Sequence, residues 1–268
     1  MSNKKRREIP VYPHPIIETH FHLDYLKEGT PEEILADARA IGVERFMTIA
    51  VQPDNMPTAL QLAESQPDVY ATLGVHPHEA ALFDDAADGY IQTHAINPKV
   101  VAVGEIGLDY FYDHCDRDVQ KQVFKRQLQL AIDCQLPVVI HTREADEDTM
   151  AILQEYAPQM PKKGVVHSFT SGLELARIAV DLGFCLGING IVTFNKADNV
   201  REVVAQTPLE NLLLETDAPY LTPVPYRGGE NAPKYLPFIA EKIAEVKNID
   251  VEEVLTATYR NSLRTFFS

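Results

Sequence analysis

Residues 100–105 read VVAVGE, and residues 136–141 read LPVVIH. Each stretch is an almost unbroken apolar run of the length of one strand, and each ends on a side chain that can bind a proton or a metal ion. Strands of this kind are typical of a parallel sheet that is covered on both faces, because a half-exposed strand alternates apolar and polar residues. The two stretches therefore predict a buried parallel sheet.

Similar apolar runs alternate with longer helical patterns over almost the whole chain, which is the pattern of repeated β/α units. The expected strands are Ile16–His20, Arg45–Val51, Tyr70–Val75, Val100–Gly104, Pro137–His141, Gly164–His167, Phe184–Ile188 and Leu212–Glu215. The expected helices include Pro31–Ile41, Asp116–Gln135, Glu144–Tyr156, Gly172–Leu182, Asn199–Ala205, Lys234–Val246 and Val251–Phe266. We predict an α/β protein with one domain, a (β/α)8 TIM-type barrel, and an open doubly wound sheet is the alternative.

The chain has 268 residues, and α/β barrels reach roughly 200–250 residues as a single unit. Its start carries a basic cluster, KKRR at positions 4–7, followed by prolines rather than by the apolar run of a signal peptide. We expect residues 1–14 to form a flexible basic arm and residues 15–268 to form the barrel. No stretch reaches the roughly 18 uncharged apolar residues of a membrane helix, so we expect no membrane contact.

The composition bounds the location and the partners. Cys115, Cys134 and Cys185 lie far apart and form no C-x-x-C pair. This pattern argues against a disulfide framework and a zinc-thiolate site, and it favours a reducing, cytoplasmic location. The formal net charge of −15 by itself repels nucleic acid. Nothing in the sequence calls for an obligatory protein partner.

Residues 15–24 read PIIETHFHLD, with two histidines one residue apart where the first expected strand ends. Side chains alternate along a strand, so Glu18, His20 and His22 are expected to point the same way. For an isolated H-x-H, a hydrogen-bonded pair of surface histidines is the plain alternative. The other strands decide between the two interpretations.

Side chains that bind metals or protons also follow or end four other expected strands. Glu105 follows the fourth strand, His141 ends the fifth, His167 ends the sixth and Asp217 follows the eighth. In a β/α barrel the carboxyl ends of all strands meet on one face, so residues far apart in the sequence can surround one cavity. Imidazoles and carboxylates without a thiolate suit Zn, Mn or Mg. Together with the H-x-H pair, they predict a metal site.

Motifs of several other enzyme classes are missing from the sequence. THFHLDYL, residues 19–26, occupies the place of a G-x-G-x-x-G loop, and neither a Walker A motif nor G-x-S-x-G occurs. A barrel in which the same groups hold a structural ion without catalysis stays open as an alternative.

Seven motifs in a fixed order resemble those of the TatD metal-dependent hydrolases, also called TatD DNases. They span about Ile17 to Phe266 and read ETHFHLD, GVHPHEA, VAVGEIGLDY, LPVVIHTREA, VVHSFTSG, LLLETDAPYL and RGGENAP. The resemblance implies a TIM-type barrel of the amidohydrolase kind with a site for one to three metal ions. It also implies hydrolysis of phosphodiester bonds in DNA, commonly from a 3′ end.

The resemblance suggests a role for each matching residue. His20 and His22 are expected to bind one divalent ion, His141 and His167 a second, and Glu105 is expected to bridge the two. We therefore expect two ions, Mg, Mn or Zn, which together can activate a water for attack on a phosphodiester.

The remaining roles concern acid–base chemistry and the substrate. Asp217 is expected to be both ligand and general base, so that it and Glu105 are the expected catalytic residues. His76, Tyr110, Arg143 and Arg227 are expected to line the substrate pocket. Single-stranded ends of DNA or RNA are the expected substrate, because a strand end enters a barrel mouth more easily than the middle of a duplex.

Two positions depart from the family pattern. Glu18 stands where the family usually has Asp, and we expect it to support a metal-binding histidine from behind. Residues 170–172 read TSG, where a Gly–Ser order is more usual. The same metals could also hydrolyse an amide, a lactone or an ester, including aminoacyl-tRNA, because fold and metals do not fix the substrate.

Overall fold

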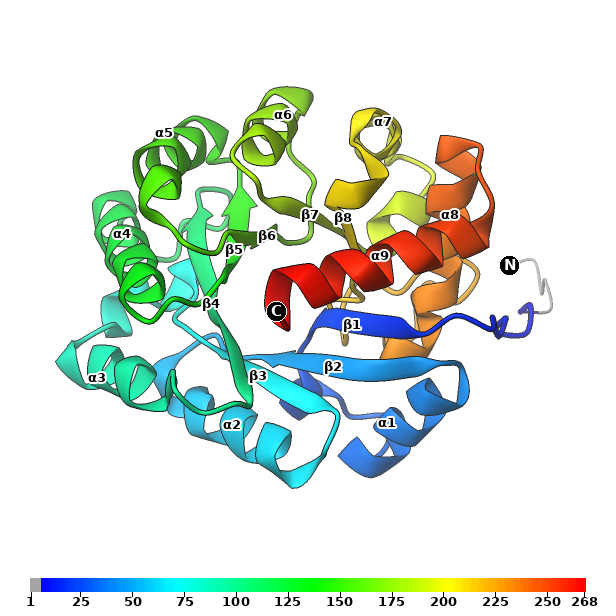
Figure 1. Ribbon diagram of the computed structural model, residues 1–268, viewed down its shortest axis with the longest axis horizontal. Coiled ribbons are helices and arrows are strands. Elements are labelled where there is room, and N and C mark those ends of the chain that lie inside the picture. The colour runs from blue at the N-terminus through cyan, green and yellow to red at the C-terminus, as the bar shows by residue number, and fades with distance from the viewer. Residues whose placement is uncertain (1–5) are drawn as a thin grey trace.

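Eight parallel strands, paired in sequence order from β1 to β8, form a nearly closed barrel in the computed structural model, which describes residues 6–268 (Figure 1). The strands are β1 Ile16–Phe21, β2 Val43–Ile49, β3 Val69–Leu73, β4 Val100–Asp109, β5 Val138–Arg143, β6 Gly164–Val166, β7 Cys185–Ile188 and β8 Leu212–Leu214. A doubly wound sheet reverses its strand order at a switch point. The uninterrupted order therefore excludes that alternative and confirms the predicted barrel.

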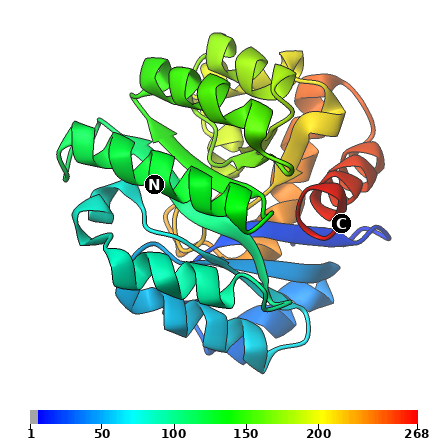
Figure 2. The same ribbon diagram turned by 60° about the vertical axis from the view of Figure 1, so that its left-hand side comes forward.

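Helices surround the strands on the outside, as the rotated view in Figure 2 also shows. They are α1 Pro31–Ala40, α2 Met56–Ser65, α3 Asp85–His94, α4 Arg117–Asp133, α5 Asp146–Tyr156, α6 Leu173–Asp181, α7 Asp198–Gln206, α8 Leu236–Lys247 and α9 Val251–Phe266. Local chemistry sets their starts: Thr30 caps α1 in a capping box with Glu33, and Pro31 takes the first helical position.

The seam between β8 and β1 is joined near the carboxyl ends of the strands. The Asp217 N–H donates to the His20 carbonyl (2.8 Å), and the His22 N–H donates to the Ala218 carbonyl (2.8 Å). Phe21 and Ala218 form a parallel bridge between these bonds. The loop after β8 is thereby fixed to the strand that carries the H-x-H pair.

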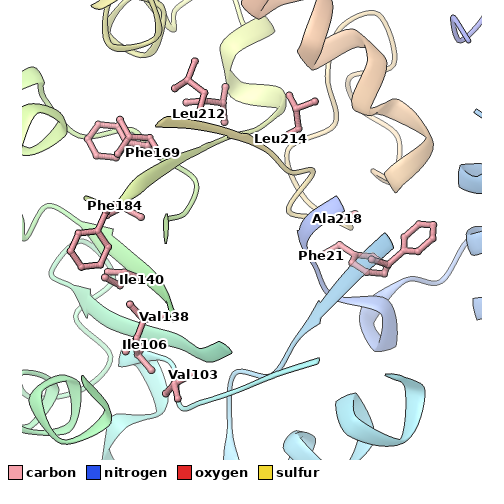
Figure 3. Close-up of a cluster of buried hydrophobic side chains, with 14 of the residues drawn as sticks. Phe21, Val103, Ile106, Val138, Ile140, Phe169, Phe184, Leu212, Leu214 and Ala218 are labelled. Carbon is pink, nitrogen blue, oxygen red and sulfur yellow. The ribbon is translucent and has the colours of Figure 1, made fainter. Parts of the chain in front are cut away.

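The strands present apolar residues on both faces, but the inner face turns from apolar to polar toward the carboxyl ends of the strands. The outer layer packs against the helices, and Figure 3 shows part of it, including Val138, Ile140, Leu212 and Leu214. The inner cluster is formed by Met47, Ile49, Val101, Ala102, Val139, Val165, Cys185, Leu213 and Phe266. Residues two apart share a face of a strand. Val139 and Val165 are therefore followed on the inside by His141 and His167.

α9 closes the amino end of the barrel. Asn261 on this helix donates to the carbonyls of Leu209 and Leu212, where β8 begins, at 2.9 Å each. Phe266 belongs to the inner cluster, and the neighbouring Phe267 ring meets Tyr70 of β3 edge to face at 4.8 Å. Figure 1 shows α9, in red, crossing the strands. The polar end of the interior, at the carboxyl ends of the strands, is thus the open one.

Residues 6–14 of the expected arm have neither helix nor strand and lie against α8. The Tyr12 hydroxyl donates to Glu241 at 2.6 Å, and Arg7 pairs with the same carboxylate. Residues 1–5, with both lysines of the basic cluster, lie outside the described residues, and the flexibility of the arm stays a prediction.

None of the helices formed by residues 6–268 has the length and apolar character that crossing a membrane needs. The three cysteines are free thiols. The cytoplasmic location and the independence from a protein partner stay predictions.

Candidate metal centre

The first group of ligand-type atoms lies at the seam. His20 Nε2 and His22 Nε2 lie 3.6 and 3.5 Å from the same oxygen, Oδ1 of Asp217. Asp217 has a left-handed backbone (φ 57°), a conformation that aspartate tolerates better than most residues. This turn, held by the hydrogen bond to the His20 carbonyl, directs the carboxylate back toward β1.

Glu105 lies between this group and a second one. Its Oε2 is 3.4 Å from His20 Nε2. Its Oε1 is 2.7 Å from His167 Nε2, 3.1 Å from His141 Nδ1 and 3.5 Å from His76 Nε2. The two oxygens of one carboxylate therefore face two different sets of imidazoles.

The sequence analysis was wrong about where β4 ends. We expected the strand to stop at Gly104, but it continues to Asp109 and places Glu105 in its middle. The continuation is possible because Gly107 has a positive φ of 140° and no side chain. A Cβ at Gly107 would lie 1.9 Å from the His141 carbonyl oxygen, so only glycine allows β4 to pair with β5 here.

Burial and mutual charge set the protonation of the centre. Burial raises the pKa of Glu105, but His167, His76 and His141 outweigh it and hold that pKa well below its usual range. Burial lowers the pKa of His167, but Glu105 and Glu215 raise it well above its usual value. Burial and the nearby His141 hold the pKa of His76 well below its usual value. The centre thus contains an ionised Glu105 carboxylate, and the imidazoles around it differ in pKa.

The donors fit a divalent metal ion. Three overlapping groups each bring their ligand atoms within 4.8 Å of one another: His20, His22 and Asp217; His20, Glu105 and His167; His76, Glu105 and His141. Both ring nitrogens of His20 are buried and have no hydrogen-bond partner among the described residues. A buried polar atom without a hydrogen-bond partner destabilises the folded state. A metal ion bound to His20 Nε2 would give one of these two nitrogens a partner.

Asp109 is a supporting residue that the sequence analysis missed. Its buried Oδ2 faces His141 Nε2 at 2.9 Å and His78 Nε2 at 3.0 Å. Burial raises its pKa, but these two imidazoles and the Tyr112 N–H outweigh it, so the pKa is lowered. A signal existed, since Asp109 and Glu105 are an even number of residues apart and share a strand face. It was lost when the strand was ended at Gly104.

Glu215, also missed, lies behind His167. Its Oε1 is 3.6 Å from His167 Nδ1 and accepts hydrogen bonds from the Ser168 N–H (2.6 Å) and the Asn189 amide (3.3 Å). Gly187 leaves the space for it, since a Cβ there would lie 2.2 Å from Glu215 Oε2. Its carboxylate can fix which nitrogen of His167 faces Glu105.

Glu18 supports the main chain rather than an imidazole. It accepts from the His20 N–H (3.1 Å), the Thr216 N–H (2.9 Å) and the Thr216 hydroxyl (2.6 Å). We expected it to support a histidine ring, but its hydrogen bonds hold the main chain of the two segments that carry His20 and Asp217. Burial raises the pKa of Glu18 to about 8.

A cavity of about 700 Å³ opens over these residues. His76 and Arg143 line it, as expected for substrate contacts. Tyr110 instead lines a neighbouring cavity of about 710 Å³, where its hydroxyl donates to Asp148. Arg227 lines neither, and its guanidinium lies 3.9 Å from the centre of the Phe194 ring.

The unusual residues 170–172 lie along the boundary of the two cavities. Thr170 lines both of them, and the Ser171 hydroxyl donates to Asp146 at 2.7 Å in the neighbouring one. The departure from the family order therefore falls beside the metal centre and leaves its ligand-type residues untouched.

A family model described as TatD related DNase matches residues 17–267, nearly the whole barrel. The chain belongs to the TatD family. It is therefore a metal-dependent hydrolase, in agreement with the ligand groups found in its cavity.

Relatives and a solved structure cover the same span. The metal-dependent hydrolase YabD of Bacillus subtilis is 38% identical and covers 94% of this chain and 98% of its own length. A Schizosaccharomyces pombe protein named Deoxyribonuclease Tat-D is 34% identical, over 93% of this chain and 91% of that one. The structure of YJJV, a TatD homolog from Escherichia coli, has a TM-score of 0.89 and 33% identity, covering 94% of this chain and 98% of that chain.

Proposed function

We propose that this TatD-family hydrolase is a deoxyribonuclease that removes nucleotides from 3′ ends of single-stranded DNA or RNA with the help of two divalent ions, Mg, Mn or Zn. One observation carries the proposal: one oxygen of Glu105 faces His20, and the other faces His141 and His167. A carboxylate in this position suits a bridge between two ions. Two-ion sites are frequent in enzymes that cleave phosphodiesters.

The contacts of Glu105 with His20, His141 and His167 support the following assignment of ligands. His20, His22 and Asp217 would hold one ion, His141 and His167 the other, and Glu105 both. When bound, the ions supply a more acidic attacking water and stabilise the charge that develops on the phosphate oxygens.

Asp217 is suited to take the proton of the attacking water. Burial raises its pKa, but the hydrogen bond from His22 and the nearby His20 and His167 outweigh it, so the pKa is lowered and the carboxylate is ionised. It lines the cavity, where a water can reach it. Arg143 lines the same cavity and can bind a phosphate through two N–H groups.

The shape of the barrel favours strand ends as substrate. The centre lies below the mouth, among side chains that are almost fully buried, and α9 closes the opposite end. A single-stranded end can enter such a recess, whereas the middle of a duplex would have to bend or melt. We expect stepwise shortening of a 5′-labelled strand and little cutting of closed circular DNA.

The central experiment starts from metal-free protein. A 5′-labelled single strand should stay intact with chelator and be shortened when Mg²⁺, Mn²⁺ or Zn²⁺ is restored in turn. Asp217→Asn should lower the rate by about 10²–10⁴-fold, the usual contribution of a general base. Asp118→Asn is the matched control, because this side chain is 80% exposed at the start of α4 and should not affect the rate.

Full activity of the metal-free protein would contradict the two-ion reaction. A panel of an amide, a lactone, an ester and aminoacyl-tRNA tests the alternative hydrolase. Cleavage of one of these substrates, without cleavage of nucleic acid, would contradict the proposed nuclease function.

A further inference from the structure

Three exposed aromatic side chains stand at the mouth of the metal cavity. Phe111 is 48% exposed, Tyr112 is 50% exposed and Tyr220 is 53% exposed. Tyr112 and Tyr220 line the cavity, and Phe111 packs against Tyr112 with ring centres 4.9 Å apart. Tyr112 follows β4 and Tyr220 follows β8, two strands on opposite sides of an eight-stranded barrel (Figure 1). Aromatic faces therefore flank the metal centre from both sides.

The backbone under these rings is fixed to the centre itself. Oδ1 of Asp109 accepts from the N–H groups of Phe111 (3.1 Å) and Tyr112 (2.9 Å), while Oδ2 faces His141. One buried carboxylate thus sets the position of both the loop and a ligand-type imidazole. The main chain that carries these rings is therefore fixed relative to the centre.

The loop after β8 is held in a similar way. The buried side-chain amide of Asn231 donates to the carbonyls of Thr216 (2.9 Å) and Tyr220 (2.6 Å). Asp217 lies inside the segment that these two bonds define. Tyr220 is therefore placed at a set distance from the carboxylate proposed as base.

Charge gives a reason for aromatic contacts with the substrate. Of the described residues that line the cavity, Arg143 is the one lysine or arginine, against Glu79, Glu105, Asp109 and Asp217. The net charge of −15 also repels a polyanion as a whole. Bases have neutral faces that stack on aromatic rings, and proteins use this to bind single strands of any sequence.

We propose that the nucleobases on the two sides of the scissile phosphate stack on Tyr112 and Tyr220. This rests on the proposed nuclease function and extends it to the recognition of the substrate. Arg143 completes the site on the β4 side, since its guanidinium lies 4.0 Å from the centre of the Phe111 ring and 4.8 Å from that of Tyr112. Arg143, which can bind a phosphate, and Tyr112, which can stack on a base, thus belong to one cluster. A buried duplex base has no free face to offer, so the site selects unpaired nucleotides.

The first test pairs changes in the protein with changes in the substrate. The probes are a 5′-labelled thymidine hexamer and the same hexamer with abasic units at its two 3′-terminal positions. Tyr112→Leu and Tyr220→Leu remove the aromatic face and keep an apolar side chain. Each should raise KM for the full hexamer by about 5- to 150-fold, which corresponds to about 1–3 kcal/mol per stacked base. We expect kcat and the metal affinity measured by calorimetry to stay within twofold.

The abasic hexamer lacks both bases, so with the wild-type protein its KM should rise by about the product of the two single-variant losses. The leucine variants should show little further loss with this hexamer, because both stacking partners are already absent. Ile96→Ala is the control: this side chain is 91% exposed in the turn before β4, at the amino end of the barrel. It should leave KM unchanged for both hexamers.

A second test does not depend on turnover. The chain contains no tryptophan, so Tyr112→Trp places a single tryptophan, which can be excited apart from the tyrosines, at the proposed stacking position. Its emission should be quenched by the thymidine hexamer and not by a hexamer of abasic units throughout.

The outcomes separate the two proposals. If the wild-type protein shortens the full and abasic hexamers equally well, or if both leucine variants keep the wild-type KM, base stacking is wrong although the nuclease function stands. If no oligonucleotide is cleaved with any of the three metals, the nuclease function fails, and the stacking proposal fails with it.

Discussion

Glu18 is a buried carboxyl whose pKa of about 8 makes the stability of the protein depend on pH. The folded protein keeps the proton of Glu18 up to about pH 8, whereas the unfolded chain releases it near its ordinary value of 4.5. Between these two values the folded state binds more protons, so the free energy of unfolding falls as the pH rises. The stability that protonated Glu18 contributes is therefore fully present below the unfolded value and is lost as the pH rises through the folded one.

Glu18→Gln should remove this dependence. Its amide oxygen can still accept from the His20 and Thr216 N–H groups, and its NH₂ can donate to the Thr216 hydroxyl. We expect urea unfolding of metal-free protein to show a smaller loss of stability from pH 5 to pH 8 in the variant than in the wild type. Parallel pH profiles for the two proteins would show that Glu18 is not protonated in the folded state.

At the level of residues, the metal centre could be predicted from the sequence because its polar side chains interrupt or follow strands that are otherwise apolar. All six residues expected as ligands come together, because five of them lie at or near the carboxyl end of a strand and Glu105 points inward from the middle of β4. Asp109, Glu215 and the aromatic rings at the mouth escaped prediction. The even spacing between Asp109 and Glu105 was hidden because β4 was expected to end at Gly104. The role of Glu215 comes from its contact with His167 of another segment, which spacing within one strand does not reveal.

α9 is the element whose role the helical pattern alone could not show. Its apolar residues predicted a helix, but the pattern does not say that Phe266 enters the barrel interior. Phe266→Ala should lower the free energy of unfolding by about 3–5 kcal/mol, since a buried phenylalanine leaves a cavity that fills poorly. The half-buried neighbour Phe267 provides the control, and Phe267→Ala should cost clearly less. Urea unfolding measures both.

Because α9 lies at the far end of the barrel from the centre, Phe266→Ala should keep the metal affinity of the wild type. A loss of metal binding in a variant that is still folded would mean that the inner apolar layer also positions the ligands.

The extent of β4 was the main error among the elements. An apolar run followed by glycine and a charged residue resembles the end of a strand, whereas in the barrel the backbone beyond Gly104 pairs with β5. Pairing of this kind is a tertiary effect that overrides local pattern. The strand order and the alternation with helices were predictable, since eight similar units leave few ways to bury their apolar faces.

For the whole molecule, the net charge of −15 limits how nucleic acid can be held. With one arginine lining the cavity, only one or two phosphates can be neutralised by the protein's own cations. Each such contact on a single strand adds roughly 0.7 to the slope of log affinity against log salt, so the slope should be about −1. Titration of the thymidine hexamer at several KCl concentrations measures it. A steep slope would contradict this short contact and would indicate many phosphate contacts outside the cavity.

The helix across the amino end makes the barrel a dead end rather than a tunnel. A strand that is shortened inside cannot pass through, and the released nucleotide and the remaining strand must leave by the opening through which they entered. The enzyme should therefore let go of its strand between cuts, so that its action is distributive. An excess of unlabelled strand added after the reaction has started should stop further shortening of labelled strands at once, whereas continued shortening of those strands would reveal a processive enzyme with an exit for its product.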